Sequence, residues 1–219
     1  MATWSEVRAV LSRLRDDDSH PLTQFPHPGS DSQRPPFQIS LAAWAVDVAE
    51  DLNRRFGSDV ALTVGALTYP DRVLDRPGPG GRSAAGIVPD LDPARARVAL
   101  DGPLSVRSGH SLIHGLLVTN QATEDLAIIS GRTLIASVVD PDSGVIVGGY
   151  SGFIAAVLVR HVVPPGETTR IPLLVATDSL VPELGYAVPP GVWGIRATMH
   201  FEAGPAARSP ILPLTITSS

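Results

Sequence analysis

The chain has 219 residues, a formal charge of −5, 43% hydrophobic residues and 18% charged residues. This balance is typical of a folded protein and too apolar for an intrinsically disordered one, and the length suits one large domain or two small ones. The 17 basic residues are scattered singly or in pairs such as Arg54 and Arg55. We therefore expect no nucleic acid partner.

Two residue types are missing from the sequence, cysteine and lysine. The absence of cysteine excludes a thiol nucleophile, a thiolate metal site and a disulfide framework. The absence of lysine excludes a Schiff base and a phosphate-loop lysine. Residues 1–15 lack the apolar core of a signal peptide, and no run approaches the roughly 20 apolar residues of a membrane span. These features predict a cytoplasmic protein without membrane, metal or cofactor.

The first predicted element is a helix near the N-terminus. Thr3 and Glu6 have the spacing of a capping box. Apolar residues then recur at three- and four-residue intervals, namely Trp4, Val7, Leu11 and Leu14. The helix should end at the acidic residues 16–18, before a proline-rich loop over residues 20–36.

A second helix is predicted over residues 40–56. Ser40 would be its N-cap, and Ile39 and Trp44 would form a hydrophobic staple. Gly57 would end it. The predicted buried stripe is Leu41, Trp44, Ala45, Val48, Leu52 and Phe56, and the pairs Glu50 with Arg54 and Asp51 with Arg55 would lie on the exposed face.

A strand and a linker follow the second helix. Residues 59–69 alternate between apolar and polar positions, which predicts a half-buried strand and makes the N-terminal region a small helical or α+β unit. Residues 76–86 (RPGPGGRSAAG) break all periodicity and are typical of a linker. We place the domain boundary near residues 87–94, with an N-terminal region at 1–90 and a second domain at 91–219.

The rest of the chain predicts an antiparallel β-sandwich of immunoglobulin type, since short β-rich runs follow one another with no helical pattern between them. The runs are residues 97–106, 111–119, 126–139, 144–150, 153–163, 168–176, 191–202 and 210–217. Residues 140–144 have the composition of a hairpin turn, and residues 164–167 that of a second turn. Trp193 should pack inside the sandwich, while Trp4 and Trp44 should be core residues of the first region.

Four segments of this region carry a family resemblance: Val118 to Asn120, the turn at 140–144, the turn Pro165-Gly166-Glu167, and the strand start Pro190-Gly191-Val192-Trp193. In this order they resemble the immunoglobulin-like domains of the bacterial intracellular proteinase inhibitor group, over residues 97–217. The resemblance implies the sandwich fold. No inhibitory residue is carried over, because Trp193 stands where the group often has tyrosine and the group lacks the helical N-terminal region.

Several residue sets contain the residue types of a catalytic or metal-binding site. Ser151, His161 and Asp140 contain the residue types of a hydrolase triad but lack a nucleophile elbow. His110 and His114 would lie about 13 Å apart on a strand, too far to chelate one zinc ion. Asp140 and Asp142 with Ser143 supply too few oxygens for calcium. The glycines of residues 77–81 do not have the strand and helix context of a phosphate loop.

We therefore assign no catalytic, metal or cofactor residue. The leading hypothesis is a non-enzymatic module whose sandwich binds another protein through its loops or an edge strand, with the helical region docking beside it. A candidate partner-binding loop is residues 177–190, with the contact residues Thr177, Asp178, Leu180, Glu183 and Tyr186. One alternative is an intracellular protease inhibitor that inserts this loop, exposed and extended, into a protease cleft. A second alternative is a small hydrolase that uses histidine and carboxylates. The oligomeric state stays open.

Overall fold

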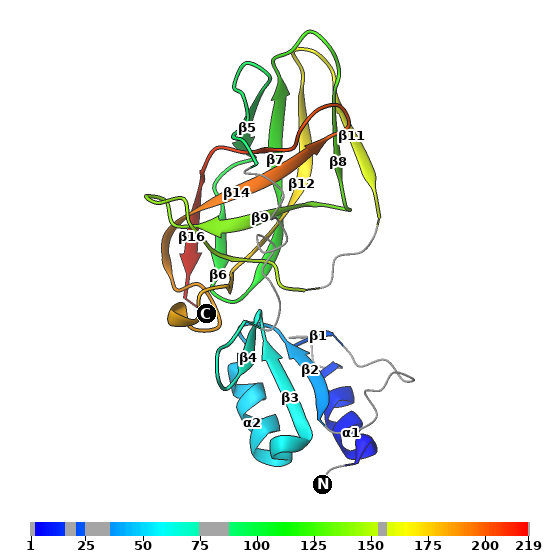
Figure 1. The fold of residues 1–219 in the computed structure, drawn as a ribbon, viewed down its shortest axis with the longest axis vertical. Coiled ribbons are helices and arrows are strands. Elements are labelled where there is room, and N and C mark those ends of the chain that lie inside the picture. Colours follow the sequence, from blue (N-terminus) through cyan, green and yellow to red (C-terminus); the bar gives the residue numbers. More distant parts are fainter. Residues whose placement is uncertain (1–2, 16–20, 25–35, 75–87, 153–156, 219) are drawn as a thin grey trace.

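The chain folds into a small α+β unit, which lies at one end of a larger, mainly β unit (Figure 1). The computed structural model describes residues 3–15, 21–24, 36–74, 88–152 and 157–218. One cluster of buried apolar side chains is drawn from residues 7–64 and a second from residues 96–216. The predicted linker at 76–86 lies outside the described residues, and the division near residue 90 stays a prediction.

The first unit has a four-stranded sheet of order β1-β2-β3-β4. Strands β2 and β3 are parallel, and the other pairs are antiparallel. The helices bury apolar residues against alternate residues of β2 and β3, so one face of the sheet holds the core. The elements are α1 (Trp4–Arg15), β1 (Leu22–Gln24), β2 (Phe37–Leu41), α2 (Val46–Phe56), the 3-10 helix η2 (Gly57–Asp59), β3 (Val60–Val64) and β4 (Leu67–Tyr69).

The predicted capping box of α1 is confirmed. The backbone N–H of Thr3 donates to Oε2 of Glu6 at 2.8 Å, and the backbone N–H of Glu6 donates to Oγ1 of Thr3 at 3.4 Å. The bond from the Thr3 backbone N–H, and then a bond that the Thr3 hydroxyl donates to the same carboxylate oxygen at 2.8 Å, lower the pKa of Glu6. Val7 and Leu11 are buried as predicted, whereas the side chain of Trp4 lies outside the described residues.

The predicted start of the second helix is wrong. Ser40 is not an N-cap: it lies in β2, where it pairs with Thr63 of β3. The alternation of Phe37, Ile39 and Leu41 is that of a strand, because all three bury their side chains in the core while parallel pairing satisfies the backbone. Helix α2 begins at Val46, after a turn that contains Trp44.

The later part of this region follows the prediction more closely. Leu52 is buried, and Arg54 and Arg55 form ion pairs with Glu50 and Asp51. Gly57 ends α2 with φ +51°. The strand expected over 59–69 is in fact two strands, β3 and β4, which form a hairpin.

The second unit is the predicted immunoglobulin-like β-sandwich. Figure 1 shows β9 and β14 running across β7 and β12. Its first half contains β5 (Ala96–Leu100), β6 (Ser105–Arg107), β7 (Ser111–Asn120), β8 (Leu126–Ser130), β9 (Leu134–Val139) and β10 (Ile146–Gly149). Its second half contains β11 (Val159–Val163), β12 (Thr168–Ala176), β13 (Asp178–Ser179), η3 (Pro182–Leu184), β14 (Gly191–Phe201), β15 (Ala207–Arg208) and β16 (Leu212–Thr217).

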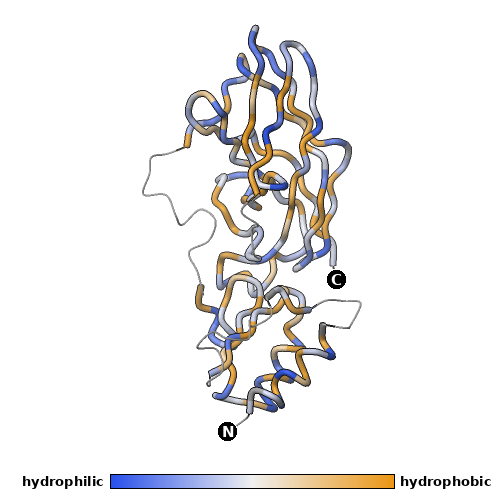
Figure 2. The backbone as a smooth tube through the Cα atoms, turned by 90° about the vertical axis from the view of Figure 1, so that its right-hand side faces the viewer, coloured by the Kyte–Doolittle hydropathy of each residue, from blue (hydrophilic) through white to orange (hydrophobic). Residues whose placement is uncertain are grey.

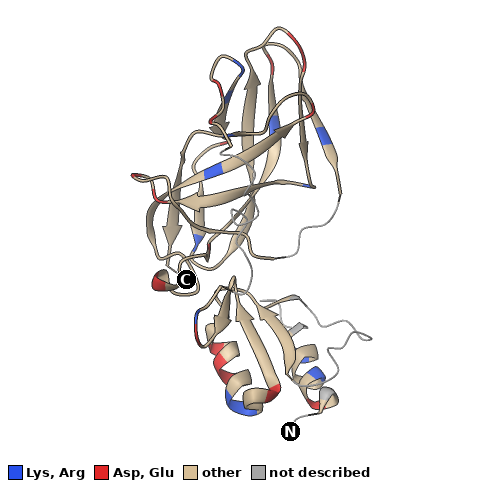
Figure 3. Ribbon diagram, viewed as in Figure 1, with Lys and Arg blue, Asp and Glu red and all other residues tan. Residues whose placement is uncertain are grey.

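Two layers enclose the sandwich core. One layer is β5-β7-β12, and the other is built around β14, which pairs with β8, β9, β15 and β16. The pairing is mainly antiparallel, with parallel pairs between β12 and β9 and between β16 and β6. Hydrophobic and polar segments alternate along the strands in Figure 2, as expected for strands with one buried face. Charges of both signs are scattered over the molecule in Figure 3.

The predicted strand runs are mostly confirmed in the described residues, although two of them divide and residues 153–156 of the run 153–163 lie outside the described part. The run 97–106 becomes β5 and β6, and the run 126–139 becomes β8 and β9. The turn at 140–144 joins β9 to β10 as an antiparallel hairpin. Trp193 packs against the sandwich core, and its Nε1–H donates to the carbonyl oxygen of Pro189 at 2.9 Å.

Candidate functional site

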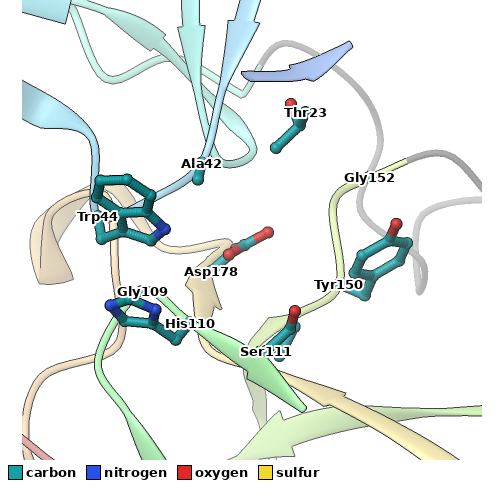
Figure 4. Close-up of a pocket in the computed structure, with 10 residues that line it drawn as sticks. Thr23, Ala42, Trp44, Gly109, His110, Ser111, Tyr150, Gly152 and Asp178 are labelled. Carbon is teal, nitrogen blue, oxygen red and sulfur yellow. The ribbon is translucent and has the colours of Figure 1, made fainter. Parts of the chain in front are cut away.

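A pocket of about 300 Å³ lies between the two units and is called the junction pocket below. Figure 4 shows Asp178 in the middle of it, with Trp44 and His110 on one side and Tyr150 on the other. Its lining residues are Thr23, Ala42 and Trp44 from the first unit, and Gly109, His110, Ser111, Tyr150, Gly152, Ala176 and Asp178 from the sandwich.

One wall of the junction pocket is a stack of two rings from different units. The indole of Trp44 and the imidazole of His110 lie parallel, with an interplanar angle of 6° and centroids 5.5 Å apart. Gly109 permits this approach: it has φ +77°, and a Cβ atom there would lie 2.8 Å from the backbone nitrogen of Trp44. A glycine at position 109 therefore allows the turn before β7 to pack closely against the turn before α2.

Asp178 supplies the carboxylate of the junction pocket. It begins β13, where it pairs with Gly149 of β10, and its side chain is half-buried. The backbone N–H of Ser151 donates to Oδ2 of Asp178 at 3.1 Å, and the hydroxyl of Ser151 donates to the same oxygen. Burial outweighs these bonds and raises the pKa of Asp178 to about 6. The carboxylate is thus mainly ionised at pH 7.

The other titratable groups of the pocket are neutral at pH 7. Burial, and then the charge of Arg107, lower the pKa of His110. Burial, and then the negative charge of Asp178, raise the pKa of Tyr150. Because a histidine with a lowered pKa has lost its proton by pH 7, the junction pocket combines one negative charge with uncharged aromatic walls.

An apolar strip, made of the exposed Ile113 and the half-buried Leu174 and Ile135, adjoins the junction pocket. Ile113 lies two residues after Ser111 on β7 and is 65% exposed. It pairs with Leu174 of β12, which pairs with Ile135 of β9, so the three side chains share a face. Ser111 pairs with Ala176, and both line the pocket. The strip therefore continues the pocket along the sheet.

The candidate contact residues of the loop at 177–190 are spread over different environments. Thr177 is fully buried, and its hydroxyl donates to the carbonyl oxygens of Arg107 and His110. Leu180 is half-buried, and its N–H donates to the carbonyl of Val147 at 2.9 Å. Asp178 alone of the five candidates lines the junction pocket.

The two remaining candidates lie farther along the loop. Glu183 is exposed in η3, and the hydroxyl of Tyr186 donates to the carbonyl of Pro70 at 3.2 Å while its ring contacts Tyr69. Tyr186 therefore connects the loop to the first unit through a hydrogen bond and a ring contact. The loop is folded around η3 and is mostly buried or half-buried, which differs from the exposed, extended loop expected of an inhibitor.

The three residues with the types of a hydrolase triad have separate hydrogen-bond partners. Ser151 donates to Asp178, and Asp140 accepts from Ser143. Nε2 of His161 lies 3.0 Å from Oγ of Ser130. The structure thus does not bring Ser151, His161 and Asp140 together as a triad.

Among the described residues, no group of three or more His, Asp and Glu side chains is placed to hold a metal ion. His110 stacks on Trp44, whereas Nε2 of His114 is buried without a hydrogen-bond partner in the described part of the chain. Asp140 holds the hairpin turn through Ser143, and Asp142 is exposed beside it. The glycines of residues 77–81 lie outside the described residues.

Sequence reasoning missed Trp44, Gly109, His110 and Tyr150 as residues of one site. The sequence pattern predicts Trp44 on the buried stripe of a helix, and it predicts His110 at the start of a strand, too far from His114 to share a zinc ion. No local pattern links positions 44 and 110, because their contact depends on how the two units pack. The one signal was Gly109 within a short Ser-Gly-His segment before a strand, which is typical of a tight turn.

Comparison with known proteins does not identify the chain. No family model and no curated protein matches it. The sporulation control protein Spo0M from Bacillus subtilis is 11% identical, with a TM-score of 0.31, over 57% of this chain and 49% of that one. The cupredoxin domain of amoB from Nitrosocaldus yellowstonii is 14% identical, with a TM-score of 0.25, over 49% of this chain and 56% of that one. The chain thus spans about half the length of each.

A third similar structure is a PapD-like domain of human CEP192, which is 13% identical with a TM-score of 0.26, over 63% of this chain and 97% of that one. TM-scores this low carry no argument about activity. The resemblance to the proteinase inhibitor group therefore stays an expectation. No described helix is long and apolar enough to cross a membrane.

Proposed function

We propose that the protein is a non-enzymatic binding module that recognises another protein through the junction pocket and the adjoining apolar strip. The observation that carries this proposal is the pocket itself. Its walls come from both units, and its volume of about 300 Å³ lies at the lower end of the range for ligand-binding pockets. Beside the pocket, the strip supplies apolar area that is exposed at Ile113 and partly exposed at Leu174 and Ile135.

The chemistry of the pocket favours binding over catalysis. A hydrolytic site needs a nucleophile within reach of a base that a third group orients. Here the Ser151 hydroxyl donates to Asp178, while the ring of His110 is stacked on Trp44. Groups held by one another in this way supply a rigid, preformed surface, which lowers the entropic cost of binding.

The proposal is tested by filling the pocket from its exposed rim. Ser111 is exposed at the start of β7, so Ser111→Trp should leave the fold intact and place an indole in the opening. The full chain would be used to capture proteins from lysate of its native cells. We expect Ser111→Trp to lose at least one protein that the unaltered chain retains in stoichiometric amount.

Ser105→Trp is the matched control, because Ser105 is also an exposed strand serine and does not line the pocket. It should capture the same protein as the unaltered chain. Identical capture by the Ser111→Trp variant and the unaltered chain would contradict the proposal. A thermal melt of each variant would show that the fold is retained.

A further inference from the structure

Asp178 is a carboxylate placed to receive a positive charge from outside the chain. Within the described part of the chain, both hydrogen bonds to its carboxylate come from Ser151, and both are accepted by Oδ2. None of the ion pairs formed by the described residues involves Asp178, although Asp51, Asp90 and Asp101 all pair with arginines. The side chain projects into the junction pocket, as Figure 4 shows. Among the described residues, none donates a hydrogen bond to Oδ1, which can therefore accept one from a ligand.

The walls around this carboxylate suit a cation with an apolar stem. Trp44 and Tyr150 lie on opposite sides of Asp178 in Figure 4. The stack with His110 fixes one face of the indole, so Trp44 is held in place. Aromatic faces attract ammonium and guanidinium groups, and the long stems of lysine and arginine pack on apolar surface. The strip of Ile113, Leu174 and Ile135 extends this surface outward.

The remaining charges agree with this assignment. Burial and the positive charge of Arg107 both lower the pKa of His110, so that ring is neutral at pH 7. The residues that line the pocket therefore supply no cation that competes for Asp178. An acidic ligand would instead meet the Asp178 carboxylate without a balancing charge inside the pocket. The net charge of −5 also favours the approach of a basic partner.

The geometry points to a lysine or arginine side chain of the partner as the group that enters the junction pocket and pairs with Asp178. This inference rests on the proposed function, since it names the chemistry of the residue that anchors the partner. The cation would donate to Oδ1 of Asp178 while its stem lies between Trp44 and Tyr150. The interaction is non-covalent, so no covalent bond is made or broken.

Capped single residues test the inference without the partner. The full chain would be titrated with N-acetyl-lysine methylamide, N-acetyl-arginine methylamide and uncharged N-acetyl-norleucine methylamide, and binding followed by the NMR signal of the Trp44 indole N–H. We expect both cationic probes to bind in the millimolar range and norleucine to bind at least about tenfold more weakly.

Asp178→Asn should weaken the cationic probes by at least about tenfold, because it removes the charge and keeps the shape. Asp142→Asn is the matched control, since Asp142 is an exposed acid outside the pocket, and it should change the affinity less than about twofold. Equal binding of norleucine, equal binding by the Asp178→Asn variant, or no binding of any probe at tens of millimolar would each overturn the inference.

These outcomes are separable from those of the proposed function. If no cation binds but Ser111→Trp still abolishes capture, the inference is wrong and the pocket still binds a partner of other chemistry. If the cations bind but Ser111→Trp captures the partner normally, the assignment to the partner's side chain is wrong, and the proposed function fails with it. Putrescine that binds more tightly than both capped residues would also overturn the assignment to a protein side chain.

Discussion

At the scale of single residues, Asp178 is the group whose energetics depend most on its surroundings. The sequence suggested it only as one of five contact residues of a loop, and four of those five do not line the pocket. The difference is physical: Thr177 is buried, and its hydroxyl donates to two carbonyl groups, whereas Asp178, the next residue, begins β13 and lines the junction pocket. The sequence predicts that neighbouring side chains of the loop alternate between buried and exposed positions. It does not predict which of these side chains face the first unit.

Asp178 should destabilise the fold when it is ionised. Its pKa rises from 3.8 to about 6 on folding, so the folded state disfavours the carboxylate. A group with a raised pKa carries no penalty below pH 4, gains it as the pH rises from 4 to 6, and carries all of it above pH 6. At 1.36 kcal/mol per unit, the full penalty is about 3 kcal/mol, and we expect Asp178→Asn to recover about 1 to 3 kcal/mol at pH 7.

Urea melts of the unaltered chain and the Asp178→Asn variant between pH 4 and pH 7.5 would measure this. The difference in unfolding free energy should be near zero at pH 4 and should grow up to pH 6. Tyr150 stays neutral over this range, and His110 titrates in both proteins, so neither accounts for the difference. A difference independent of pH would show that Asp178 is not desolvated as described.

At the scale of elements, local pattern predicted most of the chain, and its failures have clear causes. The capping box of α1 and the turn at residues 140–144 were predicted correctly, because each is stabilised by residues three or four apart. The region 37–45 was misassigned because Phe37, Ile39 and Leu41 are compatible with both a strand and a helix staple. Parallel pairing with β3, more than 20 residues later, decides between them.

The contact between the turn before β7 and the turn before α2 can be tested at Gly109. Gly109→Ala adds a Cβ atom 2.8 Å from the Trp44 backbone nitrogen at a position with φ +77°. Gly166→Ala is the matched control: Gly166 has φ +73°, but nothing lies within 4 Å of its Cβ position. The control should lose about 1 to 2 kcal/mol of stability from backbone strain, and Gly109→Ala about 1 to 3 kcal/mol more.

Denaturant melts and tryptophan fluorescence would follow both glycine variants. A more exposed indole in Gly109→Ala, and unchanged fluorescence in Gly166→Ala, would accompany the extra loss of stability. Equal losses in the two variants would mean that the Trp44 contact is not tightly packed in solution.

At the scale of the whole molecule, the site depends on both units together. The sequence predicted an α+β unit followed by a β-sandwich, because periodicity and turn chemistry act within each unit. It did not predict that Trp44 would stack on His110 or that Tyr186 would reach Pro70, since such contacts follow from the packing of one folded unit on another. Local sequence patterns therefore predict the elements within each unit but not the site between the two units.

The central claim is that a partner protein occupies the junction pocket, and photocrosslinking from its rim tests it most directly. Benzoylphenylalanine would replace Ser111, or Ser105 as the matched position, in the full chain within its native cells. The account predicts a discrete adduct with one protein from position 111, weakened by Asp178→Asn, and none from position 105. Adducts of equal yield from both positions, or an adduct from position 105 alone, would contradict it.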